Sequence, residues 1–301
     1  MKNLNVFAYN VKDAVKEISK KGTESDIALY NRKDDNGIMT VLEPSRYPEK
    51  ISSLTDSLYP SDICIIGVTK IDRELGEVIV AADLMGKRRA IFMPQVEVDR
   101  NILKKIISST GIDDYVIFDG KPMDLVSTAW GMKIGRNESG SEIIVDHSFM
   151  VKSVGTVALG FVMGGEVRKH QDLYVSDSSK KAQVRSIQMQ DEDQESAGPG
   201  SRVGLALKNV GTDDVTRGTV LSGTEISMNG NFEGEIMFHN SIKNRPGGKT
   251  EIFVSDFMRF QRGFNDSSGT VLDRPIPTVK DYAVLSSQTV TPRVFGKIKI
   301  R

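Results

Sequence analysis

The sequence has few of the residues that build disulfides and metal sites. Its one cysteine, Cys64, excludes an internal disulfide and a cysteine-ligated metal. This residue lies in the apolar run DICIIGV, so we expect a buried core thiol, which suits a reducing cytoplasm. The histidines are isolated in the sequence, and we expect His170 and His239 at the surface. We therefore expect no metal site.

Excess charge and long hydrophobic runs are also missing. Forty basic and forty acidic residues cancel, which removes a general electrostatic attraction to nucleic acid. We expect no DNA partner, and RNA binding would have to come from local patches and shape. No window is long enough to cross a bilayer, and no charged segment followed by an apolar one opens the chain. We expect a cytoplasmic protein without a membrane partner.

The first part of the chain, residues 1–138, alternates strand-like and helix-like patterns. Such alternation is typical of a mainly parallel sheet covered by helices. The 301 residues leave room for two or three domains. The patterns predict strands at 4–9, 26–31, 37–43, 61–68, 88–94 and 114–119, and helices at 11–21, 47–59, 76–86, 100–111 and 125–134.

The second part has a different pattern. Between Ile143 and Ser222, short β-branched and apolar runs recur at roughly 8–12 residue spacing, separated by Gly, Asp and Ser, which indicates a small antiparallel barrel. The runs are IIV, GTVALGFV, DLYV, AQVRSI, RVGLAL and GTVLS. The polar, glycine-bearing stretch 135–141 before them reads as a linker, so we place the barrel domain at 141–226.

The barrel segment resembles domain II of the translational GTPases of the elongation factor Tu family. The resemblance rests on the opening strand with Asp146 and Phe149, on Gly155-Thr156-Val157, and on the segments LYV, VRSIQ, AGPGxRVGLAL and RGTVLS in that order. The archaeal selenocysteine-specific factors are similar. The resemblance implies that residues 1–138 adopt a Ras-like, P-loop-NTPase-type α/β fold. It also implies that residues 230–301, which open with FEGEI, form a second, shortened domain III-like β-barrel.

The motifs of a working GTPase are missing from that first domain. A P-loop needs glycines, so that backbone N–H groups reach the phosphates, and a lysine. The turn Tyr9–Lys16 has no glycine, and Asp13 adds a negative charge there. Asn10, Lys12 and Lys16 are therefore degenerate positions, and the two lysines fit a solvated helix face better than a phosphate site.

Two further motifs fail as well. Where the family has Asp-x-Pro-Gly-His, this chain has Glu43 for the acid, Arg46 for the glycine and Tyr47 for the histidine that positions water. Where the family reads guanine with Asn-Lys-x-Asp, this chain has a segment containing Gln95 and Glu97. We therefore expect a pseudo-GTPase that binds neither GTP nor Mg²⁺ and has no catalytic residue.

The resemblance leaves the cleft between the first two domains, which receives the aminoacyl end of tRNA in that family, as the candidate RNA site. The positions that match it are Asp146, His147, Phe149, Lys208, Asn209 and Arg217. Two functions stay open at this point. One is a translation factor that binds tRNA or the ribosome without hydrolysing GTP; the other is a regulatory scaffold for a protein partner. A GTP-binding elongation factor follows from fold analogy alone.

Overall fold

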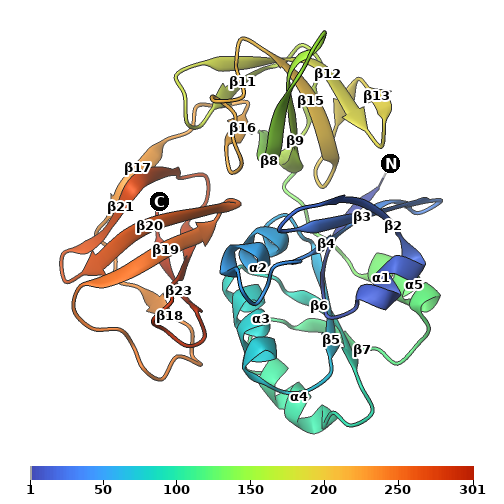
Figure 1. Ribbon diagram of the computed structural model, residues 1–301, viewed down its shortest axis with the longest axis vertical. Helices are drawn as coiled ribbons and strands as arrows, with labels where there is room; N and C mark the ends of the chain where they lie inside the picture. The colour runs from blue at the N-terminus through green and yellow to red at the C-terminus, as the bar shows by residue number, and fades with distance from the viewer. Residues whose placement is uncertain (1) are drawn as a thin grey trace.

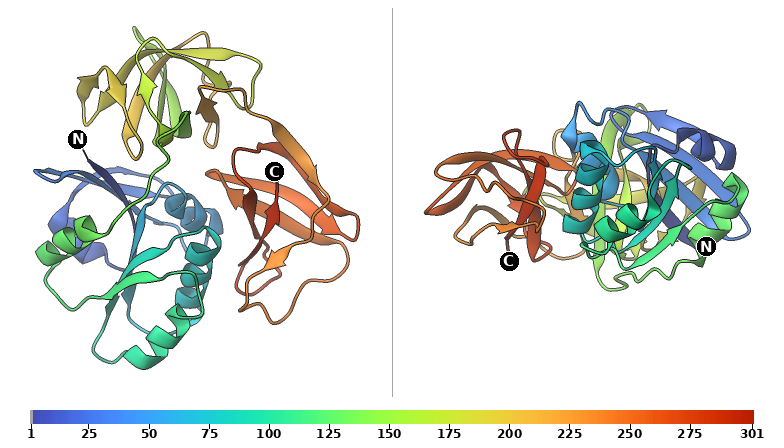
Figure 2. Two further views of the ribbon diagram at one scale, coloured as in Figure 1. Left: turned by 180° about the vertical axis from the view of Figure 1, so that it is seen from behind. Right: turned by 90° about the horizontal axis from the view of Figure 1, so that it is seen from below.

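The computed structural model describes residues 2–301, and it has three lobes set around a common junction (Figure 1). An α/β lobe, domain I, holds the N-terminal part; a β lobe, here called the barrel, follows; and a second β lobe, domain III, ends the chain. The views of Figure 2 show domain III lying beside domain I, with the barrel spanning both. This architecture confirms the predicted fold class.

Domain I is a seven-stranded sheet in the order β2-β3-β4-β1-β5-β6-β7, flanked by five helices. Strands β1, β4, β5, β6 and β7 run parallel, while β3 pairs antiparallel with both β4 and β2. The strands are β1 Asn3–Tyr9, β2 Lys20–Glu24, β3 Ala28–Asp34, β4 Gly37–Glu43, β5 Ile63–Val68, β6 Arg89–Pro94 and β7 Asp114–Ile117. The helices are α1 Lys12–Ile18, α2 Ile51–Leu58, α3 Arg73–Leu84, α4 Arg100–Ile107 and α5 Pro122–Gly131.

The predicted elements of domain I are present, with one correction. The helix expected over 11–21 ends at Ile18, because Ser19 is extended and the residues after it form β2. Lys20 and Lys21 pair with Asn31 and Tyr30 of β3, so tertiary pairing overrides the local helical pattern there. Cys64 is fully buried in the core between sheet and helices, as expected.

The barrel contains nine strands. They are β8 Ser141–Val151, β9 Gly155–Gly165, β10 Val167–Arg168, β11 Asp172–Val175, β12 Lys181–Met189, β13 Glu192–Gln194, β14 Ser196–Ala197, β15 Arg202–Lys208 and β16 Val220–Ser222. Seven of them form one sheet in the order β11-β16-β8-β9-β15-β12-β13, and an additional pairing of β11 with β12 closes it. Closure removes the free edges that an open sheet would expose.

Domain III is a seven-stranded sheet in the order β17-β21-β20-β19-β22-β23-β18. Its strands are β17 Met228–Phe232, β18 Met237–Phe238, β19 Thr250–Asp256, β20 Arg259–Asp266, β21 Gly269–Pro277, β22 Tyr282–Ser286 and β23 Val294–Lys299. The segment FEGEIMF, which reads as one strand, is divided between β17 and β18 at opposite edges of the sheet.

The apolar core continues across the junction of the three lobes. One buried cluster contains Tyr59 of domain I, Phe161 of the barrel and Phe257 of domain III. Phe257 and Met258 form the β19–β20 turn, and both have positive φ angles of 56° and 52°. This conformation is costly for bulky residues, and their burial at the junction offsets it. The lobes are therefore packed against one another.

Ion pairs also join the lobes. Arg293 lies 2.9 Å from Glu77 of α3 and donates to the Pro48 carbonyl, while β23 packs on α3. His239 lies 2.9 Å from Asp83, and its side chain is only 8% exposed. The expectation of a surface position for His239 is therefore wrong, whereas His170 is exposed. The sequence could not show this pairing, because it joins residues 156 positions apart.

Candidate functional site: the degenerate nucleotide position and the domain I–barrel cleft

The connection between β1 and α1, where the family has its P-loop, is two residues long. Strand β1 ends at Tyr9 and α1 begins at Lys12, so only Asn10 and Val11 lie between them. Asn10 has a φ of 56°, and its side-chain amide donates to the Gly67 carbonyl at 3.4 Å. The turn is thus packed directly onto the end of β5. A Cβ at Gly67 would lie 2.2 Å from the Asn10 carbonyl oxygen, so Gly67 allows this close approach.

Aromatic side chains lie beside this turn. The rings of Tyr9 and Tyr47 meet edge to face with centroids 5.7 Å apart, and the Tyr47 hydroxyl donates to the Glu74 carbonyl at 3.1 Å. Burial, with the nearby Glu74 and Asp72 carboxylates, raises the pKa of Tyr9 to about 12. Arg293 of domain III lies over the Tyr47 ring, 5.8 Å from its centroid. Tyr47, which stands where the family has its water-positioning histidine, is therefore an uncharged side chain packed at the contact between domains I and III.

The other degenerate positions are occupied by structural contacts or face solvent. Glu43 ends β4 and accepts the Tyr30 hydroxyl at 2.8 Å. Lys12 and Lys16 lie on the exposed side of α1. Gln95 and Glu97 are exposed in the turn after β6, where the sequence places the guanine-reading motif.

A cavity of about 730 Å³ lies between domain I and the barrel, where the sequence places the RNA-binding cleft. Domain I contributes the β2–β3 connection, residues 23–27, and the segment that precedes α2. The barrel contributes β8, β9, the start of β15 and the segment before β16, and the β19–β20 turn of domain III adds Met258. The lining residues are Thr23, Glu24, Ser25, Asp26, Ile27, Leu29, Leu42, Arg46, Lys50, Asp146, His147, Leu159, Phe161, Arg202, Arg217 and Met258.

Arg217, a half-buried side chain of the barrel, lines the cavity and holds the barrel to domain I as a clamp. It donates to Asp26 and to Asp56 of α2, both at 2.8 Å, and Lys50 donates to Asp26 at 2.7 Å. Burial would raise the pKa of Asp26, but the hydrogen bonds from Lys50 and Arg217 hold it below its ordinary value. Burial raises the pKa of Asp56 to about 7, and Arg217 only partly opposes this shift. Arg217 is thus an interdomain contact.

A second ion pair lies in the barrel wall. Arg202 donates to Asp146 at 2.8 Å, and its guanidinium lies over the Phe161 ring, 5.4 Å from the centroid. Both side chains are largely buried, with 15% and 12% exposure. Burial raises the pKa of Asp146, and Arg202 counters that effect in part. Asp146 therefore supports the cavity wall and has little surface to offer a ligand.

The exposed lining residues of the cleft are Thr23, Glu24, Ser25, Arg46, Lys50 and His147. Glu24 is paired with Lys21, and Lys50 with Asp26. Sequence reasoning singled out His147 but missed Arg46 and Lys50 as cleft residues; the signal for Arg46 was its place in a glycine position of the degenerate motif. Phe149 lies two residues beyond His147 on β8, with ring centroids 5.8 Å apart, and it does not line the cavity.

Lys208 and Asn209 are also outside the cleft. They lie at the end of β15, where Lys208 pairs with Gln183 of β12. The structure therefore brings together Asp146, His147 and Arg217, and it separates the other three predicted residues from them.

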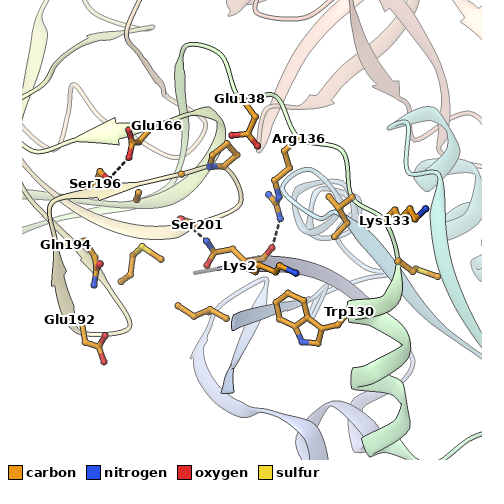
Figure 3. Close-up of a pocket in the computed structure, with 18 residues that line it drawn as sticks. Lys2, Trp130, Lys133, Arg136, Glu138, Glu166, Glu192, Gln194, Ser196 and Ser201 are labelled. Carbon is orange, nitrogen blue, oxygen red and sulfur yellow. Dashed lines mark hydrogen bonds between the residues drawn. The ribbon is translucent and has the colours of Figure 1, made fainter. Parts of the chain in front are cut away.

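Another cavity, of about 780 Å³, lies between domain I, the interdomain segment and the barrel (Figure 3). Figure 3 shows Arg136 pointing toward β1, where it donates to the Asn3 carbonyl at 2.8 Å. Arg136 also pairs with Asp62 at 2.6 Å. The segment predicted as an interdomain linker is therefore held to domain I by Arg136. Gly200, with a φ of +82°, leaves the space for Arg136, since a Cβ there would lie 1.8 Å from its guanidinium.

Residues 2–301 include no group of three or more His, Cys, Asp or Glu side chains that could hold a metal ion. Within the same residues, no helix has both the length and the apolar character needed to span a membrane.

Comparison with known proteins shows which proteins this architecture resembles. The family model for elongation factor Tu domain 2 matches residues 155–222, which are the core strands of the barrel. The protein MJ0325 of Methanocaldococcus jannaschii is 40% identical over 220 residues, which are 73% of this chain and 71% of that protein. Elongation factor 1-alpha of Methanococcus maripaludis is 25% identical over 162 residues, covering 50% of this chain and only 38% of that factor.

Among solved structures, translation elongation factor SelB from Methanococcus maripaludis, in complex with the GTP analogue GppNHp, has the same fold. The TM-score is 0.81 at 20% identity, and the match covers all of this chain and 79% of that one. All three lobes are thus common to both proteins. The chain belongs to one family with MJ0325, and the elongation factor Tu domain 2 at its centre makes it translational GTPase-like.

Proposed function

We propose that this protein is an elongation-factor-like component of translation that binds tRNA or the ribosome without hydrolysing GTP. The observation that carries the proposal is the two-residue connection of Asn10 and Val11 between β1 and α1, which has no glycine. Phosphate binding by a P-loop depends on a wide loop of backbone N–H groups and on a lysine directed at the phosphates. Asn10 is instead hydrogen-bonded to the end of β5, and Lys12 faces solvent.

Further contacts support the absence of a nucleotide cycle. Tyr47, in the place of the catalytic histidine, is buried and donates to the Glu74 carbonyl. Arg293 of domain III stands beside it, held by Glu77. A nucleotide-driven rearrangement of this segment would have to break contacts to a second domain.

Isothermal titration with GTP and GDP in the presence of Mg²⁺ tests the pseudo-GTPase part. We expect no binding in the micromolar range. SelB titrated with GppNHp serves as the positive control, since that protein has been seen with this analogue. A micromolar or tighter dissociation constant for this chain would refute the proposal.

The RNA-binding part depends on the cleft between domain I and the barrel. Arg46 and Lys50 present cations at its mouth, and His147 presents an exposed ring. Cations contact phosphates and lose affinity as salt rises, while a ring stacks on a base with little salt dependence. This division of chemistry suits the end of an RNA strand, and the cavity of about 730 Å³ can hold one nucleotide.

Sedimentation with ribosomal subunits and filter binding of tRNA test this part. Arg46→Ala should weaken binding and flatten its salt dependence, whereas His147→Ala should weaken binding with the salt dependence nearly unchanged. Lys105→Ala, at an exposed position on α4 far from the cleft, is the matched control. If neither RNA nor ribosomes bind, and a protein partner is recovered instead, the regulatory-scaffold alternative replaces this proposal.

A further inference from the structure

Domain III exposes aromatic side chains on one face of its sheet. Phe253 of β19 and Phe260 of β20 are stacked, with centroids 4.5 Å apart and ring planes 12° from parallel. On the same face Phe264 of β20 lies opposite Val271 of β21, which is 55% exposed. Arg262 lies opposite Phe253. We call Phe253, Phe260, Arg262, Phe264 and Val271 the aromatic face.

The alternation of the strands explains why these side chains share a face. Their neighbours Ile252, Val254, Gly263 and Leu272 are buried on the other side of the sheet. Because successive side chains of a strand point to opposite faces, the core takes one set and solvent receives the other. Single exposed apolar residues are ordinary on protein surfaces, but contiguous ones mark binding sites.

Two cations lie over the ring of Phe264. The Lys249 ammonium and the Arg262 guanidinium are each 5.0 Å from the Phe264 centroid. Arg262 forms ion pairs with Glu251 at 2.6 Å and with Asp273 at 3.9 Å. Because its charge is already paired, its main contribution beside the rings is the flat face of the guanidinium, on which a ligand can stack. Lys249 is exposed.

The charge of the chain is unevenly distributed. Residues 228–301 contain eleven Lys and Arg against seven Asp and Glu, although the whole chain balances. The Phe260 end of the aromatic face opens into a cavity of about 790 Å³ that Lys50 and Arg274 also line. The acidic residues of that cavity are Asp56, Asp177 and Asp213, and the first two are paired with Arg217 and Arg259. The surplus of basic residues in domain III therefore favours a polyanion as the ligand.

We propose that the aromatic face is a binding site for unpaired nucleotides of single-stranded RNA. The bases stack on Phe253, Phe260 and Phe264, while Lys249 and Arg274 contact the phosphates. Exposed aromatic rings on a sheet, flanked by cations, bind single strands with little sequence preference, because every base has a flat face. A paired strand hides its base faces, so duplex RNA gains only the phosphate contacts.

Fluorescence anisotropy with a labelled, non-self-complementary RNA of roughly 12 nucleotides tests the proposal. The full chain should bind the single strand more tightly than the same strand annealed to its complement. Phe260→Leu keeps an apolar side chain but removes the ring, and it should weaken single-strand binding at least about fivefold with an unchanged salt slope. Lys249→Gln should reduce that slope by about 0.7.

Phe149→Leu is the matched control, because Phe149 and Phe260 are both 38% exposed and Phe149 lies on the barrel. It should leave single-strand binding unchanged. Equal weakening by both variants, equal affinity for single strand and duplex, or no binding by the parent chain would each overturn the proposal. Thermal unfolding of each variant checks its fold, and Phe264→Leu replaces Phe260→Leu if the latter unfolds.

This inference does not rest on the proposed use of the cleft. In a chain that carries both Arg46→Ala and His147→Ala, which removes the cleft's own contacts to the end of an RNA strand, Phe260→Leu should still weaken probe binding at least about fivefold. Phe260→Leu alone should leave unchanged the affinity for any ligand held by the cleft alone. Loss of probe binding in the cleft variants would refute the aromatic face as the site while supporting the cleft.

Discussion

Removing Arg217 should release the barrel from domain I. Its guanidinium is the shared partner of Asp26 and Asp56, at 2.8 Å from each, and the two carboxylates are only 9% and 5% exposed. Removing one partner of a buried pair costs about 3–5 kcal/mol, because the other charge stays buried without compensation. Lys50 remains on Asp26 at 2.7 Å. We therefore expect Arg217→Ala to cost about 3 kcal/mol, the lower end of that range.

Native-state hydrogen exchange is the suitable assay, because a three-lobed chain need not unfold in one step. At pH 8, amides of α2 and of the 23–27 segment should exchange roughly a hundredfold faster in Arg217→Ala. Asp56→Asn in the same chain should restore most of the protection, since it removes the stranded charge. Arg168→Ala is the control, as its pair with Glu166 is exposed and worth little. Unchanged protection in Arg217→Ala, or no rescue by Asp56→Asn, would refute the clamp.

Three further outcomes are expected. Gly200→Ala should lower the free energy of unfolding by at least about 1–2 kcal/mol, because the alanine would have a positive φ and would clash with Arg136. Gly198→Ala is the control, since open space surrounds Gly198, and it should leave that free energy unchanged. Urea denaturation of both variants measures the difference. With a pKa raised to about 7, Asp56 binds its proton more tightly in the folded chain, so stability falls as pH rises from about 4 to 7; Asp56→Asn should flatten that fall in melting temperature against pH. Cys64, fully buried with its pKa raised by burial to about 12, should react with a thiol reagent only after unfolding; reaction at native conditions would contradict its placement.

The sequence predicted the helices and strands well wherever their pattern depends only on neighbouring residues. The strand runs of the barrel and the buried strand around Cys64 formed as expected, because alternation and apolar run length reflect which face meets a core. The expected helix over 11–21 was wrong at its C-terminal end, since pairing of Lys20 and Lys21 with β3 outweighs helical spacing.

The candidate site was predicted less completely. His147 lies at the cleft as expected, but Lys208 and Asn209 lie at the far end of β15. Arg217 has Asp213 and Asp214 close by in the sequence, but it pairs with Asp26 and Asp56 of another domain. Motif matching aligns positions along the chain, and it carries no information on which neighbour neutralises a charge.

Residue identities were enough to predict the fold class, the order of the three parts and the absence of glycine from the β1–α1 turn. Those properties depend on residue identity and on periodicity over short segments. Which charged side chains form ion pairs between the lobes, and which stay exposed, could be seen only once the packing of the domains was known. Arg217 and Asp56 are 161 residues apart, and Arg293 and Glu77 are 216 apart. Ion pairing depends on distance and burial, and both are set by how the domains pack.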